Sequence, residues 1–151
     1  MVKKVLEWRK QDPSGSETLF DELHRRNKVL ASILESGDLA NVTEAFSDIR
    51  EKIRELSERS GVPIEPPEQT ALLDAVTKNV EGVLGGVVPG AGGYDAIVLL
   101  VKDDKETLDN IMTYLEKWSA ETKSNVKLLG VKGEMDGVRL EDGTAYGDWI
   151  K

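Results

Sequence analysis

The sequence predicts an α+β domain in which a small, mainly antiparallel sheet packs against helices. Four segments between residues 2 and 79 repeat their apolar residues at helical spacing, and a fifth follows at 103–121. A glycine-rich stretch at 82–93 separates two short apolar runs of strand length, and two further short runs follow the last helix. We expect 151 residues to form one domain, helical over 2–60 and mixed helix and sheet over 62–151.

The first part of the chain has the pattern of three helices. They are expected over residues 2–10, about 16–35 and 41–61. The first ends before Pro13, because proline cannot continue a helix. Ser14 and Glu17 have the spacing of a capping box and predict the start of the second. Asn41 gives the same kind of signal for the third, which Gly61 closes.

Two more helices are expected later in the chain. One spans Glu68–Asn79, where Pro67 is well placed to start it. Its apolar face comprises Leu72, Leu73 and Val76. Asp103 and Glu106 cap the other, which ends near Glu121. Its apolar face comprises Leu108, Ile111, Met112, Leu115 and Trp118.

The glycine-rich stretch is expected to join two strands. The first, Val83–Val88, is interrupted by glycines, and the second, Ala96–Val101, is apolar and β-branched enough to be buried on both faces. Val126–Val131 and Val138–Leu140 predict two more short strands. The tail 142–151 has turn composition.

Composition and charge limit the possible partners. A net charge of −8 argues against nucleic acid and anionic membranes, which need clustered Lys and Arg. The chain has no cysteine, so it has no disulfides, thiolate catalysis or cysteine-based metal sites. The first ten residues lack the apolar core of a signal peptide, and no 18-residue apolar run could span a membrane. We therefore expect a cytoplasmic protein.

The segment Pro89–Tyr94 is the sharpest functional signal. Six of the chain's 14 glycines lie in 82–93, and such a concentration favours a backbone that adopts positive φ or approaches a ligand closely. A phosphate-binding loop of the dinucleotide or P-loop type needs its glycines to open a helix, whereas these open a strand. The sequence also lacks Gly-Lys-Ser/Thr and GxGxxG. A tight hairpin connection and a loop that approaches phosphate or a partner both remain open.

Other chemistry-bearing residues have simpler interpretations. Asp95 could orient a hydroxyl or bind Mg²⁺, but a hydrogen bond to its own turn accounts for it better. His24 is the only histidine and is expected in solvent, without a triad partner. Glu65 could face a ligand, and Glu68 fits the preference of helix starts for acids. Core or edge packing is expected for Trp8, Trp118 and Trp149.

Three segments also match a known family. They are Pro89-Gly90-Ala91-Gly92-Gly93-Tyr94-Asp95-Ala96, then Ile64-Glu65-Pro66-Pro67-Glu68-Gln69-Thr70 with Leu72-Leu73-Asp74 after it, and Val2-Lys3-Lys4-Val5-Leu6-Glu7-Trp8. In these segments, their order and their approximate spacing, the chain resembles the C-terminal part of the fungal-type phosphomevalonate kinases of the GHMP kinase superfamily. The match is strongest from Val62 to Val101.

The resemblance implies ATP-dependent phosphorylation of mevalonate 5-phosphate in isoprenoid synthesis, with ATP and Mg²⁺ serving the complete enzyme. It places a phosphate-proximal and substrate-proximal loop at Gly90, Ala91, Gly92, Gly93, Tyr94 and Asp95, and it assigns no catalytic residue or metal ligand to this chain. The family's lysine-bearing substrate motif and its ATP loop are absent from these 151 residues. The expected partner is therefore an N-terminal kinase domain, without which the chain is inactive and binds no cofactor tightly. The alternative is a stand-alone interaction or scaffold module without catalysis.

Overall fold

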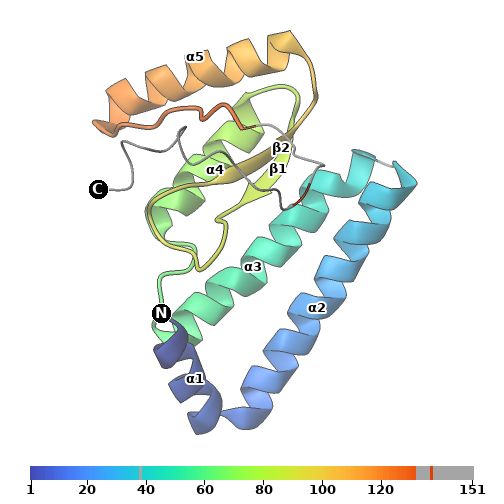
Figure 1. Ribbon diagram of the computed structural model, residues 1–151, viewed down its shortest axis with the longest axis vertical. Coiled ribbons are helices and arrows are strands. Elements are labelled where there is room, and N and C mark those ends of the chain that lie inside the picture. Colours follow the sequence, from blue (N-terminus) through green and yellow to red (C-terminus); the bar gives the residue numbers. More distant parts are fainter. Residues whose placement is uncertain (38, 132–136, 138–151) are drawn as a thin grey trace.

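A computed structural model of the chain describes residues 1–37, 39–131 and 137. In chain order the elements are α1 (Val2–Gln11), α2 (Pro13–Ser36), the 3-10 helix η1 (Leu39–Asn41), α3 (Val42–Ser60), α4 (Pro67–Asn79), β1 (Val83–Val87), β2 (Val98–Val101) and α5 (Lys105–Thr122). The helices α2 and α3 form a long hairpin (Figure 1). The helix α1 lies at the end of the hairpin where α2 begins and α3 ends, and the sheet, α4 and α5 lie on the side of α3 away from α2. The predicted α+β class is confirmed. No helix in the described residues is long and apolar enough to cross a membrane.

The helix α2 begins earlier than the capping-box spacing predicted. Asp12 is its N-cap, and the Asp12 carboxylate accepts a hydrogen bond of 3.0 Å from the Gly15 amide. Pro13 then occupies the first helical position, where its missing N–H costs nothing. The expected start near residue 16 was therefore wrong, because the Asp-Pro pair that ends α1 also starts α2. Gly37 and Gly61 end α2 and α3 in the left-handed conformation, as the sequence indicated for Gly61.

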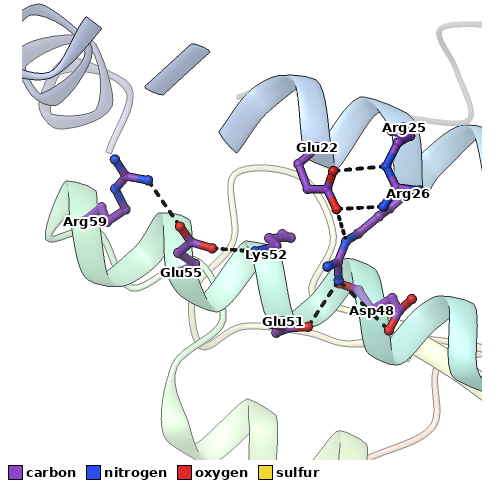
Figure 2. A network of polar contacts seen from close by, with 8 residues as sticks. All are labelled: Glu22, Arg25, Arg26, Asp48, Glu51, Lys52, Glu55 and Arg59. Atoms are coloured by element: carbon purple, nitrogen blue, oxygen red, sulfur yellow. Dashed lines mark hydrogen bonds and ion pairs between the residues drawn. The ribbon is translucent and has the colours of Figure 1, made fainter. Parts of the chain in front are cut away.

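An ion-pair network joins α2 to α3 (Figure 2). Arg26 reaches from α2 to Glu51 of α3 at 3.2 Å and also binds Glu22 of its own helix at 3.0 Å. Hydrogen bonds from Arg25 and then Arg26 lower the pKa of Glu22 from 4.5 to about 2. A second group on α3 comprises Lys52, Glu55 and Arg59. The pairs are exposed or only partly buried, and an ion pair that solvent reaches adds at most about 1 kcal/mol.

Two apolar clusters stabilise the chain. The first holds α1, α2 and α3 together through Trp8, Leu19 and Leu56. The second lies between α4, β1 and α5. Its buried members are Leu72, Val76, Val80, Val83, Ile111 and Leu115. Four of these, Leu72 and Val76 of α4 and Ile111 and Leu115 of α5, are residues that helical spacing had assigned to buried faces. Leu108 and Met112 were assigned to the same face of α5, but they are exposed.

The sheet has two antiparallel strands, β1 and β2, with a bulge between Val83 and Gly85. The glycines of β1 are there for close packing. A Cβ at Gly85 would lie 2.5 Å from the Phe46 ring of α3, and one at Gly86 would lie 2.8 Å from the Leu99 side chain. The strand β2 was expected to be buried on both faces, which is wrong: Val98 is 52% exposed, and the rest of the strand is half-buried.

Two other predictions for the region after the sheet need correction. The N-cap of α5 is Asp104, whose carboxylate accepts a hydrogen bond of 2.7 Å from the Thr107 amide, and not Asp103. Val126–Val131 is not a strand. The Ser119 hydroxyl instead binds both the amide and the carbonyl of Val126, at 3.0 and 3.3 Å, so a side chain takes the place of a strand partner there. Val138–Leu140 and the 142–151 tail lie outside the described residues.

Candidate functional site

The glycine-rich loop connects β1 to β2 over residues 88–97. It is a hairpin connection, as one of the two open interpretations held, but it is longer than a tight turn. Gly90, Gly92 and Gly93 have φ angles of 64°, 83° and 117°, which side-chain-bearing residues rarely adopt. The Gly92 amide donates to the Pro89 carbonyl at 3.2 Å and closes a turn. The positive φ angles at these three positions favour glycine over any other residue.

The loop is docked onto the segment that leads into α4. The Gly93 amide donates to the Ile64 carbonyl at 3.0 Å. Gly92 packs so closely on Ile64 that a Cβ there would lie 2.5 Å from the Ile64 Cα. The side chain of Gln69, from the first turn of α4, donates to the Tyr94 carbonyl at 2.7 Å. Two segments that are far apart in the sequence therefore form one surface.

The other side of the loop is open. Gly90, Ala91, Tyr94 and Asp95 are exposed, and a Cβ at Gly90 would meet nothing within 4 Å. Their four amides make no hydrogen bond to the described residues. Free amides that lie close together in a turn form a concavity that can bind an anion. The Asp95 carboxylate makes no hydrogen bond to the described residues either, so the expected bond to its own turn is not seen.

A buried ion-pair cluster holds the segment on which the loop rests. The Glu65 carboxylate, whose side chain is fully buried, accepts hydrogen bonds from Arg50 of α3 at 2.8 and 3.1 Å. Arg54 and the Thr70 hydroxyl each reach it at 3.0 Å. The second arm of the Arg50 guanidinium binds Asp74 of α4 at 2.7 Å. We call these five residues the Arg50 cluster.

Arg50 remains charged in this position. Burial acts to lower the pKa of Arg50, but hydrogen bonds to Glu65 and Asp74 outweigh it and raise that pKa above its ordinary value. A paired buried charge of this kind fixes geometry more than it adds net stability. The cluster ties α3, the segment before α4 and α4 itself together, and its Glu65 directly follows Ile64, on which the loop rests. One sequence pattern could have revealed the cluster: Arg50 lies on the apolar face of its helix, between Phe46 and Ile53 at helical spacing.

The model of the family described as "GHMP kinases C terminal" matches residues 19–120. The chain belongs to this family. The matched residues include the loop, the Arg50 cluster and the segment that leads into α4. No solved structure gives a significant match to the chain.

The curated relatives that match the chain are named as phosphomevalonate kinases. A phosphomevalonate kinase of Gibberella zeae is 56% identical over 150 residues, which are 99% of this chain and 34% of the relative. The phosphomevalonate kinase of Aspergillus fumigatus is 39% identical over 167 residues, again 99% of this chain and 34% of the relative. A peroxisomal phosphomevalonate kinase of Arabidopsis thaliana is 39% identical over 121 residues, 80% of this chain and 22% of the relative. The chain thus spans about a third of the length of the first two.

The other residues that the sequence offered as functional candidates lie outside the loop. His24 is exposed, as expected. Glu65 is buried in the Arg50 cluster, where its carboxylate is paired with Arg50, and Glu68 is exposed in the first turn of α4. Trp8 is buried in the first apolar cluster and Trp118 packs against the second, whereas Trp149 lies outside the described residues. The described residues contain no group of three or more acidic or histidine side chains placed to hold a metal ion.

Proposed function

We propose that the chain acts as the C-terminal part of a phosphomevalonate kinase, in which residues 89–95 form one side of the site for phosphoryl transfer from ATP to mevalonate 5-phosphate. One observation carries the proposal. In a chain 56% identical to a phosphomevalonate kinase, a loop with four free amides is locked onto a rigid support. The loop residues proposed to lie near phosphate are Gly90, Ala91, Gly92, Gly93, Tyr94 and Asp95.

The chemistry of the loop fits a phosphate group. Backbone amides donate hydrogen bonds to phosphate oxygens, and residues without bulky side chains let those oxygens approach. Phosphoryl transfer depends mainly on positioning and on charge stabilisation, so donors held in place before the substrate arrives are useful. The glycines supply the approach, and the contacts with Ile64 and Gln69 supply the fixed position.

The cationic part of such a site must come from elsewhere. The chain carries a net charge of −8, and no metal-ligand group is present in its described residues. Mg²⁺ neutralises charge on the transferring phosphate when it is bound, and in this proposal the ATP phosphates and the remaining part of the kinase hold it. The proposed partner is therefore the part of the kinase that lies outside the match.

Exposed apolar side chains support a partner of this kind. Leu108 and Met112 of α5 and Leu128, Leu129 and Val131 after it are 39% to 88% exposed. Met112 and Leu128 line the same groove of about 650 Å³. Apolar surface of this kind is more typical of an interface than of a free monomer surface.

A chimera tests the proposal. This chain should replace the matching third of the Gibberella zeae phosphomevalonate kinase, and turnover of mevalonate 5-phosphate should be followed by coupled ADP release. We expect turnover by the chimera and none by the chain alone. A chimera that folds, by circular dichroism and thermal melting, yet shows no turnover while the parent enzyme does would contradict the proposal. Tight binding of ATP and mevalonate 5-phosphate by the chain alone would contradict the proposed dependence on the rest of the kinase.

The stand-alone interaction or scaffold module is the second candidate. It gains support if the chimera is inactive and the chain recovers a stable partner that is not a kinase. For the compartment we propose the cytoplasm, and a fluorescent fusion tests this.

A further inference from the structure

Gln69 is a buried polar side chain to which the proposed function gives no role. It lies in the first turn of α4 and is only 8% exposed. Its amide group donates to the Tyr94 carbonyl at 2.7 Å, and no other side-chain hydrogen bond reaches residues 88–97 from the described parts of the chain. A buried amide costs free energy unless it is paired, so an apolar residue would pack there at lower cost. The Tyr94 contact is what the glutamine provides.

This contact fixes the orientation of one peptide plane. The described residues contain no cis peptide bond. In a trans peptide the carbonyl and the following N–H point in opposite directions. Since the Tyr94 carbonyl points at Gln69, the Asp95 amide points away from α4. The Asp95 amide makes no hydrogen bond to the described residues, and Asp95 is exposed.

The exposed surroundings of this peptide make such a contact important. The orientation of the Tyr94–Asp95 peptide is set by ψ of Tyr94 and φ of Asp95, and both residues are exposed. A rotation of the Tyr94–Asp95 peptide by half a turn would replace an N–H donor on the open side with a carbonyl oxygen. An outward carbonyl would repel the phosphate that an outward amide attracts.

We propose that Gln69 is a positioning residue that holds the Tyr94–Asp95 peptide with the Asp95 amide toward the phosphate groups of the substrates. The inference rests on the proposed function of the loop. Gln69 itself does not touch the substrate, because its amide group is engaged behind the loop. The Arg50 cluster fixes Gln69 in turn, since Thr70, the next residue of α4, donates a hydrogen bond to Glu65 in the segment that leads into the helix.

Two substitutions separate positioning from packing. Gln69→Met keeps the length of the side chain and removes the donor. Gln69→Glu keeps the shape, and once ionised it presents an acceptor to the Tyr94 carbonyl. Glu68→Gln is the matched control, because Glu68 is exposed on the same helical turn. In the active chimera we expect both Gln69 variants to lower kcat about 10- to 100-fold, below the effect of removing a donor itself. KM should change by less than about threefold, and Glu68→Gln should stay within about twofold.

The pH profile gives a second readout. A protonated glutamic acid can donate to the Tyr94 carbonyl and an ionised one cannot. The kcat of Gln69→Glu should therefore recover toward the unsubstituted value as the pH is lowered, while Gln69→Met shows no such recovery. Two variants with the same pH profile, or with kcat equal to that of Glu68→Gln, would overturn the inference.

Nuclear magnetic resonance of the chain alone distinguishes this failure from failure of the proposed function. In both Gln69 variants we expect large shifts of the Tyr94 carbonyl and Asp95 amide resonances, with little change in apolar-core resonances. Unchanged loop resonances would overturn the inference. If the unsubstituted chimera is inactive, the proposed function fails, and the inferred role of Gln69 in phosphate positioning is overturned with it even where the loop resonances shift.

Discussion

Replacing Gly92 by alanine should destabilise the docked loop much more than the same change at Gly90. Both residues have positive φ, at 83° and 64°, so alanine at either costs about 1–2 kcal/mol in the backbone. Gly90 faces open space, whereas a Cβ at Gly92 would lie 2.5 Å from the Ile64 Cα. Such overpacking against backbone costs about 1–3 kcal/mol more. The expected totals are therefore about 1–2 kcal/mol for Gly90→Ala and about 2–5 kcal/mol for Gly92→Ala.

Urea unfolding of the two variants and the unsubstituted chain measures this difference. With a slope of about 2 kcal/mol per molar urea, the midpoint should fall by about 1–2.5 M for Gly92→Ala and by about 0.5–1 M for Gly90→Ala. Hydrogen exchange of the Gly93 amide, which donates to the Ile64 carbonyl, reports whether the loop detaches before the rest of the chain unfolds. Equal midpoints together with equal protection of the Gly93 amide would refute the close docking of the loop on Ile64.

Three further predictions concern the ion pairs of α2 and α3, the Arg50 cluster and the cap of α5. Two arginine partners lower the pKa of Glu22 from 4.5 to about 2, so their contribution to stability is complete above pH 4.5 and is lost as the pH falls through 2. Glu22→Gln should therefore melt below the unsubstituted chain at about pH 7, and the two melting temperatures should converge toward pH 2. Arg50→Ala should lower the free energy of unfolding by about 3–5 kcal/mol, because it leaves a buried carboxylate with fewer partners. Lys52→Ala should cost less than about 1 kcal/mol, because its partner Glu55 is partly exposed and keeps its ion pair with Arg59. Asp104→Ala removes the cap of α5 and should cost about 0.5–2 kcal/mol in urea unfolding, while the neighbouring Asp103→Ala should change stability by less than about 0.5 kcal/mol.

Local patterns were enough to predict the helices. The apolar residues of the helix over 42–60 repeat at helical spacing, and Gly61 ends it as expected. The start of α2 was misplaced because two cap signals overlap there: Asp12 followed by Pro13, and Ser14 followed by Glu17. Which of two adjacent caps is used depends on where the preceding helix ends, and the local cap pattern does not contain this information.

The candidate site could be predicted only in part. Positive φ and strand-to-strand position of the loop follow from its glycines, and the structure has both. The docking contacts join residues about 25 positions apart, such as Gln69 and Tyr94, and no local pattern encodes them. The strand expected at Val126–Val131 failed for a related reason. An apolar, β-branched run forms a strand only where a partner edge is available, and there a serine hydroxyl binds the backbone instead.

The helix α3 is what makes the loop a fixed structure. At one end of α3, the Thr43 hydroxyl donates to the Leu84 carbonyl at 2.8 Å and Phe46 packs on Gly85, so the strand that enters the loop is held. Near its other end, the Ser57 hydroxyl accepts from the Ile64 amide at 3.2 Å, and in between Arg50 binds Glu65. One rigid helix therefore sets both the strand from which the loop departs and the segment on which it rests. In the proposed kinase site, the loop amides are therefore in place before the phosphate arrives, because their orientation depends on α3 and α4 and not on the ligand.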